Sequence, residues 1–129
     1  MDKEKTFKIA FRLIGVYDVL LGMAFALFFR NIYTALGIAL PNHPGYIYVP
    51  ALFLVSGGIG EFLIAQHPLR NVDLAIVRLL MKLSFAGAII YCYFKYGIPT
   101  IFLLISILSI AGIIKNLLFI RWVRSVQKA

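Results

Sequence analysis

The chain has 129 residues, of which 62% are hydrophobic and 14% charged, and its mean hydropathy is +0.93. A soluble domain of this length has close to half apolar residues and could not hide such an excess, so lipid must be the solvent. The formal net charge of +8 would suggest nucleic acid in a soluble protein. Here the cations flank apolar segments, where lipid headgroups account for them, and no nucleic-acid partner is expected.

Four apolar segments are long enough to cross the hydrocarbon core of a bilayer, which takes about 20 helical residues. They cover residues 9–29, 47–65, 75–96 and 98–120, and the rest of the chain is too short for a soluble domain. We therefore predict a single transmembrane domain over residues 1–129. Its fold class is all-α, an integral membrane four-helix bundle with short loops.

The longest connection, residues 31–46, predicts a short helix in the membrane interface, because Leu36 and its apolar neighbours share one face. Pro41 then ends this helix in a turn. In the second span we expect Pro50 in the first turn, where its missing N–H is harmless. The segment SGGIGE, residues 56–61, supplies small residues that let a neighbouring helix come close.

Lysine and arginine residues beside the spans predict the orientation, because cytoplasmic loops carry the excess of these cations. With the N-terminus inside, seven cations lie in the inner segments and two in the outer loops, so both termini should be cytoplasmic. The inner seven are Lys3, Lys5, Lys8, Arg70, Arg121, Arg124 and Lys128, and the outer two are Arg30 and Lys95. The last three inner cations share a helical stripe, which predicts a helical tail facing lipid headgroups.

The sequence indicates no metal site and identifies no cofactor. His43 and His67 are the only histidines, and the predicted topology puts them on opposite sides of the bilayer. No cluster of nitrogen, sulfur or oxygen ligands has metal-binding spacing. Cys92 is the only cysteine, which rules out an internal disulfide.

Six charged residues lie in the inner half of the predicted spans or near their middle. An aspartate near the middle of a span costs about 2.5–3.5 kcal/mol on insertion scales, so Asp18 should face protein or trapped water. We expect its carboxylate within hydrogen-bonding reach of Lys82, Arg78, Tyr17 or a water. The interpretation of Arg12, Arg78 and Lys115 that needs no functional site is that their side chains snorkel to the cytoplasmic interface. The sixth is Glu61, in the second span.

Two interpretations of the deeper charges stay open. The first is structural, either an ion pair between the first and third spans or a protonated, neutral Asp18. The second is a ligand or proton site in a pocket open toward the cytoplasm. There Asp18 and Glu61 would accept protons, and Arg78 and Lys82 would hold an anionic or carbonyl group. Tyr17 would either donate a hydrogen bond or face a neighbour, because adjacent helix positions point about 100° apart.

Three segments carry a family resemblance: RLIGVYDVLLG in the first span, GGIGEFL in the second and LLMKLS around Lys82. The chain resembles the DoxX-like family of small bacterial four-helix membrane proteins, and NHPGY with HPLRN is similar to an uncharacterised branch. This resemblance implies a multi-pass protein of the bacterial cytoplasmic (inner) membrane, often an accessory subunit of redox or thiol systems. The chain lacks the paired cysteines that a thiol-redox role needs.

The favoured function is therefore an accessory or assembly subunit of a larger membrane complex, while an enzymatic role stays open. Its partners would be the lipid bilayer and either a membrane protein or a second copy of the chain. One alternative is a small dimeric proton-coupled transporter that uses Asp18. Another is a lipid or sterol-type isomerase, similar to EXPERA-domain proteins, with Asp18 and Glu61 as its acid–base pair.

Overall fold

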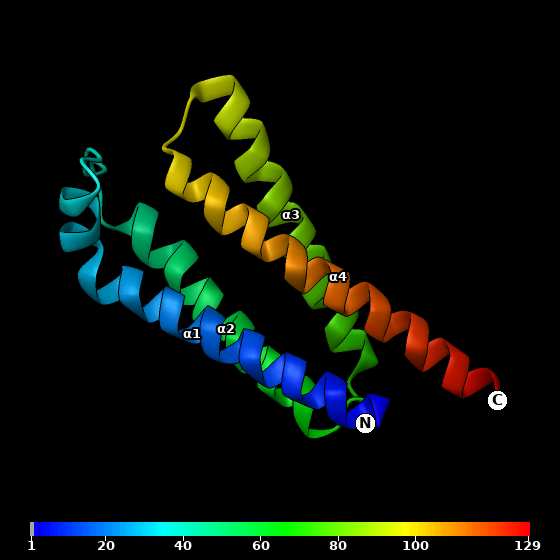
Figure 1. The fold of residues 1–129 in the computed structure, drawn as a ribbon. Coiled ribbons are helices and arrows are strands. Elements are labelled where there is room, and N and C mark those ends of the chain that lie inside the picture. The colour runs from blue at the N-terminus through cyan, green and yellow to red at the C-terminus, as the bar shows by residue number, and fades with distance from the viewer. Residues whose placement is uncertain (1) are drawn as a thin grey trace.

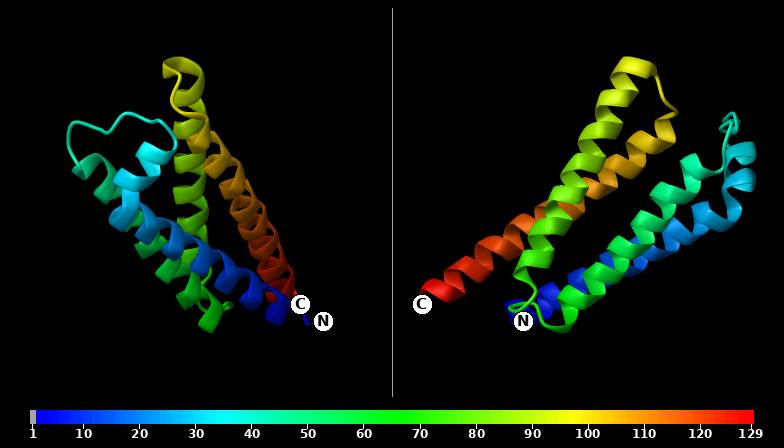
Figure 2. Two further views of the ribbon diagram at one scale, coloured as in Figure 1. Left: turned by 60° about the vertical axis from the view of Figure 1, so that its left-hand side comes forward. Right: turned by 180° about the vertical axis from the view of Figure 1, so that it is seen from behind.

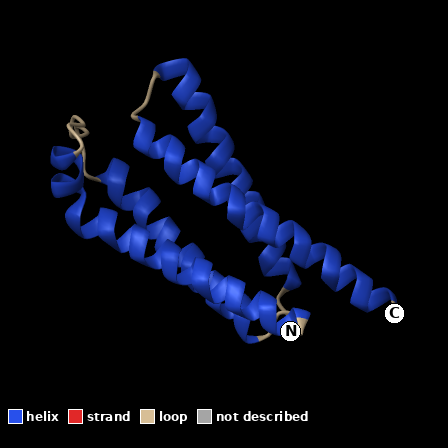
Figure 3. Ribbon diagram, viewed as in Figure 1, coloured by secondary structure: helices blue, strands red, loops and turns tan. Residues whose placement is uncertain are grey.

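Four long α-helices make up almost the whole protein. A computed structural model describes residues 2–129, and in this range the helices are α1 (Lys3–Ala35), α2 (Gly45–Gln66), α3 (Val72–Tyr96) and α4 (Thr100–Lys128), with no strand (Figures 1 and 3). Met1, the first residue of the predicted domain, lies outside the described residues. Each helix is long and apolar enough to cross a membrane. The all-α four-helix bundle is confirmed, and the protein is a small multi-pass membrane protein.

Local chemistry explains where several helices begin and end. The Asp2 side chain caps α1 by accepting a hydrogen bond from the Glu4 N–H at 3.2 Å. Helix α3 ends at Gly97, whose φ of 66° lies in the left-handed region that glycine adopts without a steric penalty. Pro99 then precedes α4, where a residue without an N–H donor is tolerated. These signals keep the α3–α4 connection to three residues.

Two details of the predicted helices are wrong. A short helical segment does follow the first span, but it is the end of α1, which kinks at Phe28, where φ is −124° and ψ is 19°, and stops at Ala35, well before Pro41 (Figure 2). Pro50 lies inside α2 and not in its first turn. The reason is that α2 already begins at Gly45, with the Tyr48 N–H donating to the Pro44 carbonyl at 3.0 Å. The helical C-terminal tail is present, since α4 continues to Lys128.

The four helices form two antiparallel hairpins, α1–α2 and α3–α4. Each helix packs mainly along its hairpin partner, and the hairpins converge at the end that holds both chain termini (Figures 1 and 2). A core cluster joins all four helices there, made of Phe11, Ile64, Ala65, Ala75, Phe119 and Val123. Toward the 36–44 loop the hairpins diverge, and a smaller cluster around Phe29, Tyr33 and Ile47 contacts Phe102 of α4. The protein is therefore closed at the terminal end and looser at the other.

Glycines allow α1 and α2 to approach closely. A Cβ atom on Gly58 would lie 2.8 Å from the Gly15 carbonyl oxygen, and one on Gly22 would lie 2.6 Å from the Ala51 carbonyl oxygen. Such distances leave no room for a methyl group. The role predicted for residues 56–61 thus holds at Gly58, in the contact between neighbouring helices.

Replacing Gly22 with alanine is expected to lower the free energy of unfolding by about 1–3 kcal/mol, because the added methyl group meets backbone atoms of α2 that cannot move aside. The matched control is Gly87→Ala in α3, where an added Cβ meets nothing within 4 Å. The control should keep its stability or gain up to about 1 kcal/mol from its better helix propensity. Denaturant titration of both variants in detergent compares them, and equal stabilities would contradict the close packing.

Candidate functional site

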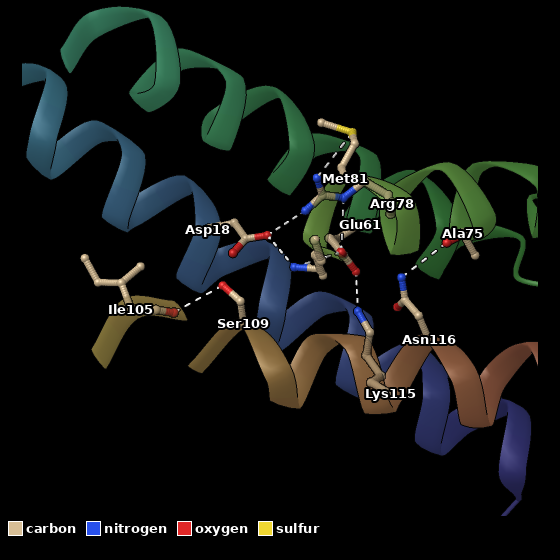
Figure 4. Close-up of polar contacts among 10 residues, drawn as sticks. Asp18, Glu61, Ala75, Arg78, Met81, Ile105, Ser109, Lys115 and Asn116 are labelled. Atoms are coloured by element: carbon tan, nitrogen blue, oxygen red, sulfur yellow. Dashed lines mark hydrogen bonds and ion pairs between the residues drawn. The ribbon is translucent and has the colours of Figure 1, made fainter. Parts of the chain in front are cut away.

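Five charged side chains from all four helices form ion pairs with one another between the hairpins. They are Asp18 of α1, Glu61 of α2, Arg78 and Lys82 of α3, and Lys115 of α4, and each is between 0% and 8% exposed. Figure 4 labels all of them except Lys82. We call this group the ion cluster. The first hairpin contributes both carboxylates and the second contributes all three cations.

Arg78 connects the two carboxylates of the first hairpin. Its Nη2 donates to Asp18 Oδ2 at 2.8 Å, and its Nε donates to Glu61 Oε1 at 3.2 Å. Charge-assisted hydrogen bonds of this kind are stronger than neutral ones, and burial reduces their screening. Arg78 therefore ties α3 to both α1 and α2.

The two lysines of the ion cluster come from different helices, Lys82 from α3 and Lys115 from α4. Lys82 Nζ lies 3.3 Å from Asp18 Oδ2 and 3.6 Å from Glu61 Oε1. Lys115 Nζ donates to Glu61 Oε2, and it also lies 3.9 Å from the centre of the Phe11 ring. Glu61, which is completely buried, thus faces three cations.

Glycines again make room for the longest side chains. A Cβ on Gly57 of α2 would lie 2.2 Å from Arg78 Nη1, and a Cβ on Gly112 of α4 would lie 3.0 Å from Lys82 Cδ. Larger residues at these two positions would push the cations out of the cluster. Two glycines of the GGIGE segment therefore have different roles: Gly58 makes room for α1, and Gly57 makes room for the guanidinium group of Arg78.

A cavity of about 480 Å³ adjoins the ion cluster on the side of the 36–44 loop. Asp18, Arg78 and Lys82 belong to its lining, whereas Glu61 and Lys115 do not. The other lining residues are mostly apolar or aromatic and come from all four helices, among them Phe25, Tyr33, Leu54, Phe85, Phe102 and Ile105. The cavity is an apolar space with charged groups at the end nearest the chain termini.

This position corrects the expected direction of the pocket. A pocket open toward the side of the termini was expected, but the lining residues of every helix lie on the loop side of the ion cluster. The core cluster around Phe11 and Phe119 fills the space between the hairpins on the terminal side. The pocket can form only where the hairpins diverge.

The structure brings Asp18, Glu61, Arg78 and Lys82 together, and Asp18 has the contacts with Arg78 and Lys82 that were expected. Tyr17 lies apart, exposed on α1 with no hydrogen bond to Asp18 among the described residues.

The snorkelling interpretation is wrong for Arg78 and Lys115, which are buried, because the Asp18 and Glu61 carboxylates offer charged partners inside the protein. Arg12 is exposed on α1, outside the cluster.

Two polar residues of α4 were not anticipated as partners in the interior. One is Lys115, the third cation of the cluster, and the other is Asn116, whose Nδ2 donates to the Ala75 carbonyl at 3.2 Å. Lys115 and Asn116 are consecutive residues in an otherwise apolar run, at a depth in the membrane similar to that of Glu61. This similar depth was the feature of the sequence that could have indicated a contact with Glu61. Arg121, Arg124 and Lys128 are exposed on the last turns of α4, and their contact with headgroups stays a prediction.

Fold and site together define a class: a small multi-pass α-helical membrane protein with a buried ion cluster at one end of an apolar cavity. No family model, curated protein or solved structure matches the chain. The resemblance to the DoxX-like family therefore stays a prediction from the sequence, and the geometry of the site is the basis on which a function can be inferred.

Proposed function

We propose that this membrane protein binds a lipid-like amphiphile in the cavity between its two hairpins. The observation that supports this most is the combination of an apolar space of about 480 Å³ with Asp18, Arg78 and Lys82 at one end. Small-molecule sites typically have volumes of about 300–1,000 Å³, mostly apolar walls and a few convergent polar groups. An amphiphile dissolved in the surrounding bilayer has the matching chemistry, one polar end and an apolar body.

The lining of the cavity also suggests how such a molecule would enter. Val49 and Phe53 of α2 and Met81 and Phe85 of α3 line the cavity and are at the same time exposed on the outer surface of the protein. In a membrane this surface faces lipid. A ligand would therefore pass sideways from the bilayer between α2 and α3, without crossing water.

The role in the cell that we propose is that of an accessory or assembly subunit, which would offer the bound amphiphile to a membrane protein partner or to a second copy. We place it in the bacterial cytoplasmic membrane with both termini inside, in keeping with the DoxX-like resemblance. The seven-to-two distribution of flanking cations supports the orientation. The four helices themselves indicate only that both termini lie on the same side of the membrane.

The two alternatives have unequal support. A transporter is favoured by one observation, the divergence of the hairpins at a single end, which resembles a state open to one side. An isomerase has less support, because Glu61 lies outside the cavity lining while Asp18 lies within it. The two carboxylates therefore do not flank a common substrate space as an acid–base pair would.

Filling the cavity tests the proposal. Ile105→Trp places a large ring in the lining from α4, whereas Ile107→Trp, two residues away, places the same ring on the exposed face of α4. We expect native mass spectrometry to detect bound amphiphile on the wild type and on the Ile107 variant, and at least about tenfold less on the Ile105 variant. Equal retention by both variants would show that the cavity is not the binding site.

A further inference from the structure

The charges of the ion cluster do not balance. Its three cations and two carboxylates leave one surplus positive charge in the interior. An uncompensated charge at membrane depth is costly and marks an ion or substrate site more often than a structural one. No group of the ion cluster compensates the surplus positive charge, so a bound anion is the natural partner for it.

The geometry locates this surplus at the cavity. Lys115 pairs with Glu61 alone, and both lie outside the cavity lining, although Glu61 also contacts Arg78 and Lys82. The three groups that line the cavity are Asp18, Arg78 and Lys82, one carboxylate and two cations. Asp18 Oδ2 accepts from both cations, so its single charge is shared between them.

Arg78, which is one of these lining residues, has hydrogen-bonding capacity left over. Its Nε and Nη2 bind the carboxylates of Glu61 and Asp18, but its Nη1 is directed at the Met81 sulfur atom, 3.8 Å away. A thioether is a weak acceptor, and a guanidinium group carries five N–H donors. A bound anion would be a far better partner for these donors than sulfur is.

We propose that the amphiphile bound in the cavity is an anion, with a phosphate or carboxylate head on Arg78 and Lys82 and its apolar chain along the aromatic walls. This inference rests on the proposed function and adds the chemical class of the ligand. A single negative charge neutralises the surplus of the ion cluster. The head occupies the end of the cavity near Asp18, and the chain extends toward the 36–44 loop.

A series of ligands with one common chain tests the charge directly. Tetradecyl phosphate, tetradecanol and tetradecylammonium are titrated into the wild-type protein in an uncharged maltoside detergent, and bound ligand is counted by native mass spectrometry. We expect the phosphate to bind about tenfold more tightly than the alcohol, and the ammonium to bind most weakly. The series needs no substitution, so it decides the proposal independently of how any variant folds.

The outcomes separate this inference from the proposed function. Equal binding of the phosphate and the alcohol would overturn the anionic ligand and leave the amphiphile site standing. Binding of none of the three would overturn the amphiphile site as well. Inorganic phosphate that binds as tightly as tetradecyl phosphate would assign the site to a free anion and would equally overturn the proposal.

Two lysine variants of α3 locate the effect. Lys82→Met removes the surplus charge with a side chain of similar length, and it should abolish most of the preference for phosphate while tetradecanol still binds. Lys95→Met removes a charge from the exposed end of the same helix, where Lys95 donates to the Tyr91 hydroxyl at 2.7 Å. The preference should be unchanged in this control. An unchanged preference in the Lys82 variant would contradict the proposed placement of the head.

Discussion

Replacing Glu61 with glutamine is expected to lower the free energy of unfolding by about 3–5 kcal/mol, the usual cost of removing one partner from a buried ion pair. The loss should be large because Glu61 is fully buried and faces Arg78, Lys82 and Lys115. The amide keeps the shape of the side chain but leaves three cations with one carboxylate. Denaturation by sodium dodecyl sulfate in mixed micelles, followed by circular dichroism, measures the change.

Two further variants show that the effect of Glu61→Gln comes from buried charge. Glu4→Gln removes a partly exposed carboxylate that pairs with Lys8 one turn away, and it should change stability by less than about 1 kcal/mol. Adding Lys115→Met to Glu61→Gln removes the cation that depends on Glu61 and should restore part of the stability. A Glu61 variant as stable as the Glu4 variant would rule out the ion cluster as a source of stability.

Asp18→Asn is expected to cost about 1.5–3 kcal/mol, the contribution of hydrogen bonds to a charged group. The effect should be smaller than at Glu61, because Asp18 lines the cavity and pairs with two cations, not three. Asparagine keeps one acceptor oxygen for Arg78. The same denaturation experiment applies, together with the binding of tetradecyl phosphate.

The Asp18 result separates the two interpretations that the sequence left open. If the carboxylate is structural, Lys82→Met in the same chain should recover stability, since the unpaired cation is removed. If it acts mainly on a ligand or proton, the single variant should keep its stability and show altered binding, with no rescue. Asp73→Asn, at an exposed position in the first turn of α3, is the control and should cost no more than about 1 kcal/mol.

The helices could be predicted from the sequence because the bilayer requires about 20 apolar residues for each crossing, whatever the later packing. The kink at Phe28 could not. Sharp kinks are usually signalled by proline or glycine, and neither stands at or beside this position. The bend coincides with a tertiary contact instead, since the next residue, Phe29, packs edge-on against the ring of Tyr48 in α2.

The contacts of Asp18 could be predicted for a similar reason, since a carboxylate at this depth must find a cation. The inward turn of Lys115 could not, because apolar residues surround α4 on all sides and the pattern does not show which face points inward. Depth along a helix can be counted from the sequence, but rotation about its axis is decided by packing. The cavity was misplaced for the same reason, since it depends on the angle between the hairpins.

The division of charge between the hairpins has a consequence for biogenesis. During synthesis α1 and α2 enter the membrane first, and they carry Asp18 and Glu61 before any cation of the cluster has been made. Each unpaired charge costs about 2.5–3.5 kcal/mol on insertion scales, so the early hairpin is an incomplete intermediate. Arrival of Arg78, Lys82 and finally Lys115 supplies the cations that the two carboxylates lack. The ion cluster thus makes the second half of the chain an obligatory partner of the first, and a product truncated after α2 would keep two carboxylates in the membrane without the cations that pair with them.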